Sequence, residues 1–485
     1  ISQLYPTLFT DPSRSYIAFV TQVTPRGISV EFSKYSADIP ISNMRWASPY
    51  SRTKYVNNRS LDRADRVINV GDVVWVKPSK RVTWARWADV ISSGETSLSL
   101  ILDQFPRVQG SVFAYDFHTG YVQSVVGGLD FDRSPFNRAN QACRQPGSTY
   151  KPIYYSLGLD TGKFSMGSIL HDRAYVPDEG EFWKPQNVHG TLDGKGTMHY
   201  ALVHSLNLPS IQVLKSVGAE NTKKWARKLG YTTPIIADKA LALGASCIRQ
   251  DEHTRAFGTF FRNGTQKDPV YIRRILNRNG DIVMDHTHVE DPTISESARL
   301  TRLWEMTSDH PEQLIDERTS FLITKMLRDT VKMGTARSCQ KIPIPTAGKS
   351  GTSSDTMDLW FVGGTSNWAV STWVGDDNYQ RPLGKKEASY TAAIPMWVDY
   401  VGSVVTDQVG SNTATKTWPH RDLPLRRPPG LKRSVMDAMT GGLPHGGSQS
   451  VSVYYKPGTF HHRRHVPRMS IDTTDSLGEN PEPLY

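Results

Sequence analysis

The chain carries the stretch PGSTYKPIYYSL at residues 146–157. Pro146-Gly147 is a turn signal, and the apolar residues after it predict a helix that begins near Ser148. Positions i and i+3 share a helix face, so Ser148 and Lys151 are expected to be able to meet. Pro152 has no amide hydrogen and is tolerated best in a first turn, which supports this helix start. A serine is a weak nucleophile until a base takes its proton, and a neutral Lys151 is the leading hypothesis for that base. The alternative is a helix-start serine with a solvated lysine one turn later.

A second short motif is Ser205-Leu206-Asn207, at the end of an apolar run that predicts a helix. Pro209 predicts that this helix has ended just before it. A loop there can place the Ser205 hydroxyl as a proton shuttle next to Lys151, and the Asn207 amide can hydrogen-bond a peptide substrate. The alternative is that Asn207 only caps the C-terminus of the helix.

A third motif is Lys349-Ser350-Gly351-Thr352, followed by residues 358–364 and 368–375, which predict two strands and a turn. A strand edge with Lys349, Ser350 and Thr352 can bind a terminal carboxylate through charge and hydroxyl donors. Gly351 would let a substrate approach the backbone closely. Lys349 is also the second cation that, together with burial, would lower the pKa of Lys151. The backbone amides of Ser148 and Thr352 are the candidate oxyanion donors.

The order S-x-x-K, S-x-N and K-[ST]-G matches the motif set of serine acyl-transfer enzymes that act on penicillin or on D-alanyl peptides. S-x-x-K alone is a weak signal, because Ser51…Lys54 and Ser338…Lys341 also match it. The second and third motifs each occur once, in the expected order. A solvated lysine at a glycine turn would explain Lys349 by itself, but not its occurrence together with the other two motifs.

With these residues the chain resembles the transpeptidase domain of class A penicillin-binding proteins, over roughly residues 106–420. The resemblance implies an α/β (α+β) serine transpeptidase fold, in which an antiparallel sheet is flanked by helices and the nucleophile lies at a helix start beside the sheet edge. Ser350 replaces the commoner threonine of the third motif and keeps the hydroxyl. The likeness also covers residues 125–128, 136–139, 144–148, 183–187, 242–245 and 360–363.

The resemblance also implies a reaction. Ser148 would attack the carbonyl between two D-alanines of a peptidoglycan stem peptide, D-alanine would leave, and an amine of a neighbouring stem peptide would resolve the acyl-enzyme as a cross-link. β-Lactams would acylate the same serine, and neither a metal nor a diffusible cofactor is needed. The implied partners are stem peptides, β-lactams, other cell-wall synthesis proteins and, through an N-terminal anchor outside this chain, the inner membrane at its periplasmic face. No segment resembles the glycosyltransferase domain of the family, and no nucleic-acid partner is expected.

Several other functions remain open. A D,D-carboxypeptidase would use water as the acceptor, and a penicillin-sensing domain or inactive scaffold would keep Ser148 and Lys151 without peptide turnover. A β-lactamase needs a way to activate water, and no Glu-x-x-Leu-Asn segment follows the second motif. The net charge of +10 suits anionic lipid and peptidoglycan carboxylates, but it suits nucleic acid equally well.

The length of 485 residues predicts two to four domains. Short β-type runs at 16–20, 27–32 and 70–76 predict a small barrel, OB-like in character. Basic and aromatic residues at 81–87 would suit nucleic-acid binding there, but an accessory module is favoured. The chain begins at Ile1 and is expected to be a fragment or renumbered; neither a signal peptide nor an apolar run of membrane-helix length is present. The predicted boundaries are a linker remnant at 1–9, an OB-like domain at 10–103, a transpeptidase domain at 104–420 that begins with a strand at 111–116, and a partly disordered C-terminal extension at 421–485.

Two groups of residues are candidates for a metal site and for a disulfide. The run at residues 461–465, HHRRH, is a candidate metal cluster, but a solvated tail is favoured because no matching carboxylate or cysteine spacing accompanies it. Cys143, Cys247 and Cys339 allow at most one internal disulfide. Cys143 is interpreted as a buried, small apolar residue rather than a reactive thiol.

Overall fold

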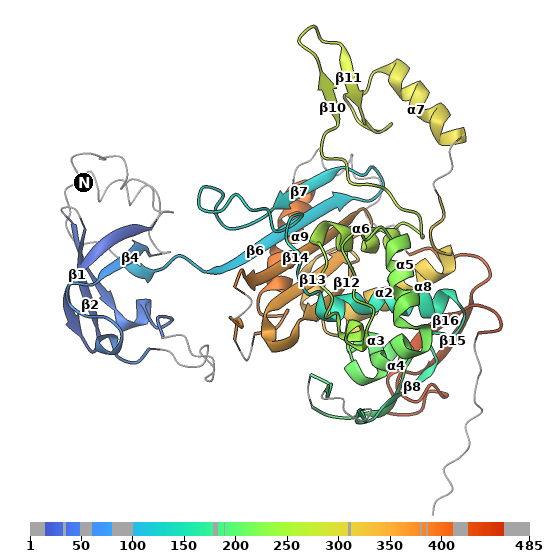
Figure 1. Ribbon diagram of the computed structural model, residues 1–485, viewed down its shortest axis with the longest axis horizontal. Coiled ribbons are helices and arrows are strands. Elements are labelled where there is room, and N and C mark those ends of the chain that lie inside the picture. The colour runs from blue at the N-terminus through green and yellow to red at the C-terminus, as the bar shows by residue number, and fades with distance from the viewer. Residues whose placement is uncertain are drawn as a thin grey trace, which may run out of the picture.

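The computed structural model shows a small curled sheet joined to a larger unit in which helices cover a second sheet (Figure 1). Strand β6 begins a few residues after the last strand of the small sheet and leads directly into the larger one. The structure describes residues 15–32, 35–48, 61–79, 100–177, 183–188, 190–308, 312–378, 381–384, 387–410 and 425–459.

The small sheet has five strands in the order β3-β2-β1-β4-β5, and its two outer strands also contact each other. Side chains of β1 alternate between the two faces, so that Tyr16, Ala18 and Val20 are buried while Ile17 and Phe19 are exposed. The predicted barrel is therefore confirmed. Its elements are β1 (Tyr16–Thr24), β2 (Gly27–Phe32), β3 (Tyr35–Pro40), η2 (Ile41–Asn43), η4 (Ala64–Arg66), β4 (Val73–Pro78) and β5 (Leu100–Asp103).

The larger sheet is antiparallel throughout, in the order β12-β13-β14-β6-β7. Every residue of β13 is buried, which requires cover on both faces. The predicted strands at 111–116, 358–364 and 368–375 are present, and the third motif lies on β12, an edge strand. The strands are β6 (Val108–Asp116), β7 (Val122–Val126), β12 (Ala347–Thr352), β13 (Asp358–Gly364) and β14 (Trp368–Asp376).

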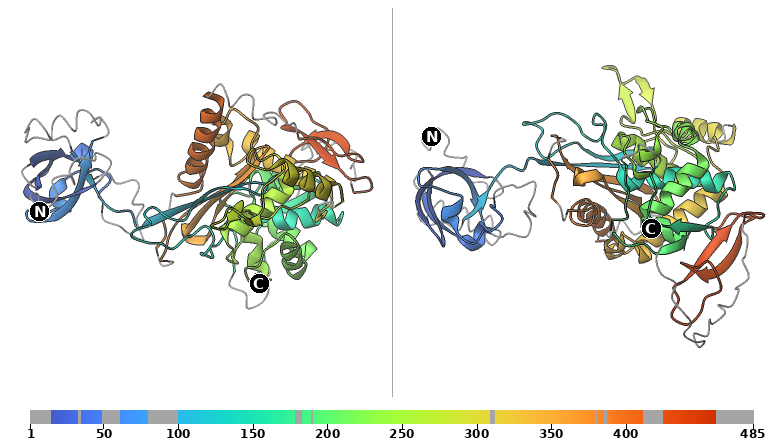
Figure 2. Two further views of the ribbon diagram at one scale, coloured as in Figure 1. Left: turned by 90° about the horizontal axis from the view of Figure 1, so that it is seen from above. Right: turned by 60° about the horizontal axis from the view of Figure 1, so that its bottom comes forward.

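Alternate residues of β13 point into two separate cores, as the two-residue period of a strand dictates. Leu359 and Phe361 pack with Trp397 of helix α9 on one face. Trp360 and Val362 belong to the main core on the other face, with helices α2, α6 and α8. Figure 2 shows α9 on its own side of the sheet. The predicted sheet flanked by helices is thus confirmed.

The helices of the larger unit provide most of the main core, and α2 contributes nine consecutive buried residues, 151–159. A further hairpin, β10–β11, and helix α7 stand away from the sheet in Figure 1. The helices and turns are η5 (Gly147–Tyr150), α2 (Lys151–Asp160), α3 (Met198–Val203), α4 (Asn207–Val217), α5 (Ala219–Lys228), η6 (Lys239–Leu243), α6 (Gln250–Phe261), α7 (Glu296–Ser308), α8 (Glu317–Met333), η7 (Arg337–Lys341), η8 (Ser354–Thr356) and α9 (Ala393–Gly410); the remaining strands are β8 (Ile169–Asp172), β9 (Gly194–Thr197), β10 (Arg274–Leu276), β11 (Ile282–Asp285), β15 (Lys432–Asp437) and β16 (Ser450–Tyr455).

The hairpin β15–β16 belongs to the main core, although it lies within the region predicted as a C-terminal extension. Met436, Val451 and Val453 are buried in that core, and the Tyr454 ring packs edge-on against Phe321 of α8 at 5.1 Å between centroids. The strand pattern at residues 451–455 is confirmed as β16. The candidate metal cluster at 461–465 and the basic, aromatic segment at 81–87 lie outside the described residues.

Within the described ranges, every helix is too short or too polar to cross a lipid bilayer.

Shortening a buried side chain of helix α2 should destabilise the larger unit. Ile153 is fully buried in the main core, so we expect Ile153→Ala to lower the free energy of unfolding by about 2–4 kcal/mol. Urea unfolding followed by far-UV circular dichroism measures this difference. Lys224→Ala, at an exposed position on α5, is the matched control and should change stability by less than about 0.5 kcal/mol. Equal unfolding midpoints for the two variants would contradict the assigned core.

Candidate active site

The first motif lies where a turn enters a helix. The 3₁₀ turn η5 contains Ser148 and runs directly into α2, whose first residue is Lys151. Pro152 lies in the first turn of α2, as predicted. Ser148 is half-buried, whereas the three residues after it are buried. The helix start is confirmed, with one short turn inserted ahead of it.

Lys151 is fully buried, so the alternative of a solvated lysine is wrong. Its Nζ donates hydrogen bonds to Ser205 O at 2.8 Å, Leu206 O at 3.0 Å and Asn207 Oδ1 at 2.8 Å. Among the described residues, no hydrogen bond joins Lys151 to Ser148, although the two share a helical turn. The lysine is therefore held by the second motif rather than by Ser148.

Ser205 lies between two lysines. Its Oγ accepts a hydrogen bond from Lys349 Nζ at 2.8 Å, and Lys151 Nζ lies 3.5 Å away. The residue follows the end of α3 and has φ +59°, in the left-handed region that few non-glycine residues adopt. Strained backbone of this kind is concentrated at functional sites. The Ser205 hydroxyl therefore lies between the two buried lysines, and its role as a proton shuttle stays a prediction.

Asn207 is the first residue of helix α4, so the alternative of a C-terminal cap is wrong. Its Oδ1 accepts from Lys151, and its Nδ2 donates to Gln186 O at 2.7 Å. The amide is thereby oriented with its oxygen toward the lysine.

Asn187 supports the second motif from another segment, and sequence reasoning assigned it no role. Its Oδ1 accepts from the backbone amides of Asn207 at 2.9 Å and Leu208 at 3.3 Å, so it caps the start of α4. Its Nδ2 donates to both carboxylate oxygens of Asp172, at 2.8 and 3.0 Å. In the sequence, the stretch 183–187 shows only a likeness to the family. Nothing near Asn187 indicates that it caps a helix that begins twenty residues later.

The third motif supplies the edge of the site. Lys349 is fully buried, so the alternative of a solvated lysine is wrong here too. Ser350 Oγ is hydrogen-bonded to Thr335 Oγ1 at 2.8 Å, and Thr352 Oγ1 lies 3.2 Å from Ser389 Oγ. Neither Thr335 nor Ser389 was singled out from the sequence.

Burial changes the acidity of both lysines. Desolvation lowers the pKa of Lys349 to about 7. Desolvation, and then the nearby charge of Lys349, lower the pKa of Lys151 well below its usual value. The oxygen acceptors around Lys151 Nζ favour the protonated form and oppose that shift. The net direction of the shift is nevertheless toward the neutral form that a base requires.

Glycines bring three backbone segments into contact behind Ser148. An ideal Cβ on Gly147, which has φ +54°, would lie 2.6 Å from Thr352 O, and one on Gly351 would lie 2.3 Å from Pro146 O. One on Gly244 would lie 2.1 Å from Gly147 O. The sequence predicts that Gly351 allows a substrate to approach closely. The structure gives a second reason for a glycine here, because the Pro146 backbone already lies against it. The same contacts bring the backbone of Ser148 beside that of Thr352.

A buried histidine supports the turn from behind and carries no sequence signal. His253 Nε2 lies 2.9 Å from Thr149 Oγ1, and its Nδ1 lies 2.5 Å from Tyr231 OH. Thr149 Oγ1 in turn donates to Pro146 O at 2.7 Å. Burial lowers the pKa of His253 to about 3, so the ring is neutral and positions the turn through hydrogen bonds alone.

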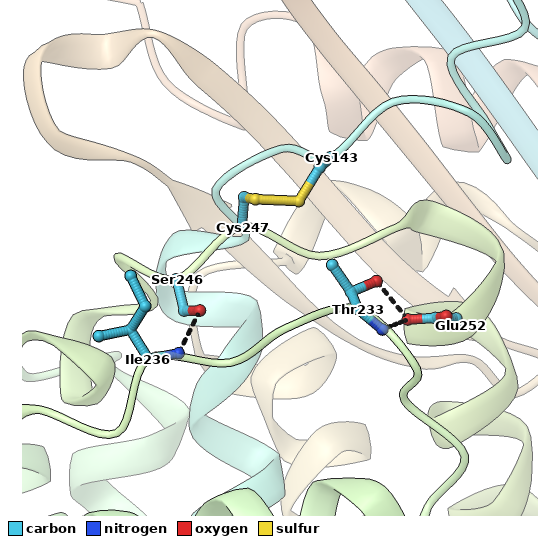
Figure 3. The surroundings of a disulfide bond; sticks show 6 residues. All are labelled: Cys143, Thr233, Ile236, Ser246, Cys247 and Glu252. Carbon is cyan, nitrogen blue, oxygen red and sulfur yellow. Dashed lines mark hydrogen bonds between the residues drawn. A yellow bond between two sulfur atoms is a disulfide. The ribbon is translucent and has the colours of Figure 1, made fainter.

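Cys143 and Cys247 form a disulfide (Figure 3). The interpretation of Cys143 as a buried, small apolar residue is therefore wrong, because Cys143 is half-buried and bonded. The pair is the one internal disulfide that the three cysteines allow, and the cysteine left over is the buried Cys339. Sequence separation concealed the pair, because the two residues are 104 positions apart.

Comparison with known families decides the relationship of the chain. The penicillin binding protein transpeptidase domain matches residues 110–394, more than half of the chain, and the penicillin-binding protein OB-like domain matches residues 7–108. The chain belongs to the class A penicillin-binding proteins.

Individual relatives of this chain belong to the same family. Penicillin-binding protein 1A of Pseudomonas aeruginosa is 30% identical over 459 residues, covering 87% of this chain and 52% of that protein. Penicillin-binding protein 1A of Neisseria meningitidis serogroup A is 31% identical over 352 residues, covering 71% and 40%. The crystal structure of penicillin-binding protein 1A from Haemophilus influenzae has the same fold, with a TM-score of 0.70 at 23% identity over 96% of this chain and 66% of that one. The chain spans about half the length of the curated relatives it matches.

The close approach at Gly351 should be essential for the site. A Cβ there would meet the backbone oxygen of Pro146, which has no flexible end to move aside. We expect Gly351→Ala to displace the Ser148 turn and to slow covalent labelling by a fluorescent penicillin about 10²-fold. Gly446→Ala is the matched control, because no atom lies within 4 Å of its added Cβ. Similar labelling rates for the two variants would show that the backbone contact is unimportant.

Proposed function

We propose that this chain is a peptidoglycan D,D-transpeptidase that cross-links stem peptides through an acyl-enzyme on Ser148, and that β-lactams inhibit it by acylating the same serine. The observation that carries the proposal is the Ser205 hydroxyl between two buried lysines, Lys151 and Lys349, beside the half-buried Ser148 turn. This arrangement offers a nucleophile, a base of lowered pKa and a path for a proton.

Acylation begins when neutral Lys151 accepts the proton of Ser148 Oγ. The oxygen attacks the carbonyl carbon between the two D-alanines, and the carbonyl oxygen becomes an oxyanion. The backbone amides of Ser148 and Thr352 donate to that oxyanion; removal of one such donor typically costs about 3–4 kcal/mol of transition-state stabilisation. The proton then passes from Lys151 by way of Ser205 to the amine of the departing D-alanine.

Substrate recognition uses the third motif and Asn207. Protonated Lys349 attracts the terminal carboxylate, while the hydroxyls of Ser350 and Thr352 donate hydrogen bonds to it. Asn207 orients the peptide through its amide. Deacylation reverses the proton path when an amine of a second stem peptide attacks the ester carbonyl and releases Ser148.

The family also supports a cellular setting for this reaction. We place the chain at the periplasmic face of the bacterial inner membrane, with peptidoglycan stem peptides and β-lactams as ligands and other cell-wall synthesis proteins as partners. A D,D-carboxypeptidase would use the same acylating group with water as acceptor, and a penicillin-sensing domain would stop at the acyl-enzyme. A separate assay is therefore needed to show whether an amine or water accepts the acyl group from Ser148.

Intact mass after incubation with benzylpenicillin tests the acylation. We expect one drug molecule added to the wild type and none added to Ser148→Ala, because the hydroxyl proposed to be acylated is removed. Ser338→Ala is the matched control, since Ser338 belongs to a second S-x-x-K match on the exposed surface and should not affect the adduct. Rapid drug hydrolysis without an adduct would instead indicate a β-lactamase. Incubation with a pentapeptide and a free amine then distinguishes cross-linked product from simple loss of D-alanine.

The pH dependence of acylation tests the coupling of the two lysines. Below its pKa of about 7, Lys349 is charged and lowers the pKa of Lys151. Lys349→Gln removes that charge, raises the pKa of Lys151 and should move the acid limb of the acylation rate to higher pH. Lys349→Arg stays charged at every pH in this range, whereas wild-type Lys349 loses its charge above about pH 7, so this variant should hold the limb at or below its wild-type position. Second-order acylation rates between about pH 5 and about pH 10 measure the limb; an unmoved limb in the glutamine variant would exclude coupling.

A further inference from the structure

The Cys143–Cys247 disulfide lies close to the turn that carries Ser148. It joins segments 104 residues apart, with their Cα atoms 5.2 Å from each other. Cys143 precedes Ser148 by one short stretch of chain, and Cys247 follows Gly244, the residue that packs on the Ser148 turn. Figure 3 shows the bond bridging the two neighbouring segments. The disulfide therefore connects the segment just before Ser148 with the loop that packs against the Ser148 turn.

Backbone hydrogen bonds also join the two segments. Arg144 and Ile248 exchange backbone hydrogen bonds of 3.0 and 2.9 Å, next to the disulfide. Closer to the nucleophile, Gly147 N donates to Gly244 O at 3.4 Å, which is long for a hydrogen bond. The contact at the two glycines is backbone against backbone, and so it lacks side chains that interlock. The hydrogen bonding between the segments thus weakens toward Ser148.

The Cys247 segment is itself firmly attached to the body. Ser246 Oγ accepts from the Ile236 amide at 3.0 Å (Figure 3). Glu252 of α6 accepts from Thr233 N at 3.2 Å and from Thr233 Oγ1 at 2.6 Å. A link from Cys143 to this segment therefore ties the approach to Ser148 to a fixed support.

We infer that the Cys143–Cys247 disulfide is a positioning crosslink for acylation, which holds the Ser148 turn against residues 244–248. The inference rests on the proposed role of Ser148 as the acylated residue. A misplacement of about 1 Å can slow a reaction about 10²-fold. A partial loosening of this turn, with His253 and the glycine contacts intact, should slow the acylation step roughly tenfold. Binding of the drug before acylation should change less than about twofold, because the carboxylate contacts lie on β12.

Reduction offers a way to remove the crosslink without mutation, since both cysteines are half-buried rather than enclosed. A thiolate of a dithiol reductant attacks one sulfur, the protein S–S bond breaks, and a mixed disulfide forms. The second thiolate of the reductant then displaces the protein sulfur. Two electrons and two protons pass to Cys143 and Cys247, and the reductant leaves as a cyclic disulfide.

The experiment compares acylation kinetics of the whole chain in oxidised form, after dithiothreitol, and as the double variant Cys143→Ser with Cys247→Ser. Intact mass verifies reduction as a gain of two hydrogen atoms, and circular dichroism verifies that the protein is folded. Stopped-flow acylation over a range of penicillin concentrations separates the acylation rate constant from the dissociation constant of the initial complex. We expect the reduced protein and the double variant to show the same roughly tenfold lower rate constant.

Two controls isolate the disulfide. Dithiothreitol should not change the double variant, and Cys339→Ala, which removes the buried free cysteine, should keep the full response. Unchanged acylation after verified reduction would overturn the inference, and so would unfolding of the reduced protein, which would assign the bond to the fold alone. Absence of any acylation of the oxidised wild type would instead overturn the proposed function.

Discussion

Two lysine ammonium groups buried around one serine hydroxyl are the constraint on which the rest of this site depends. An isolated buried charge is very unfavourable unless it finds hydrogen-bond acceptors or loses its proton. Here both solutions are present: backbone and amide oxygens surround Lys151, and burial brings the pKa of Lys349 down to about 7. The Ser205 hydroxyl joins the two groups. The desolvation that is costly for stability is the same effect that makes a lysine available as a base.

The elements around these lysines come from distant parts of the chain and meet through backbone contact. Edge strand β12 brings Lys349, the start of α2 brings Lys151, and the link between α3 and α4 brings Ser205. Glycines at 147, 244 and 351 permit the close approach, because a Cβ at any of them would overlap a backbone oxygen. Residues behind the site then fix its parts: Asn187 caps α4, and His253 supports the Ser148 turn. The side chains of the candidate site thus lie on rigid elements, and their positions depend on the residues packed behind them.

The sheet explains why such a site can be rigid. Its central strand is buried on both faces, with α9 on one side and the larger helical core on the other. The C-terminal hairpin adds its own apolar residues to that core. The OB-like domain has a separate core around β1 and β2. Each of the two family domains therefore has its own buried apolar interior, which is the physical basis for treating them as domains.

The sequence by itself determined the local features: a turn and helix start at Ser148, strands around residues 358–376, the small barrel, and the three motifs whose order indicates the family. These follow from turn residues, short apolar runs and i to i+3 spacing, all of which act over a few residues. Only the tertiary structure decided the Cys143–Cys247 pairing, the cap by Asn187, the support from His253 and the second reason for Gly351. It also ruled out the alternative of a C-terminal cap for Asn207, which begins a helix, and reversed the interpretation of Cys143, which is bonded. Such contacts join residues tens to hundreds of positions apart, and only the packing of whole elements selects the partner.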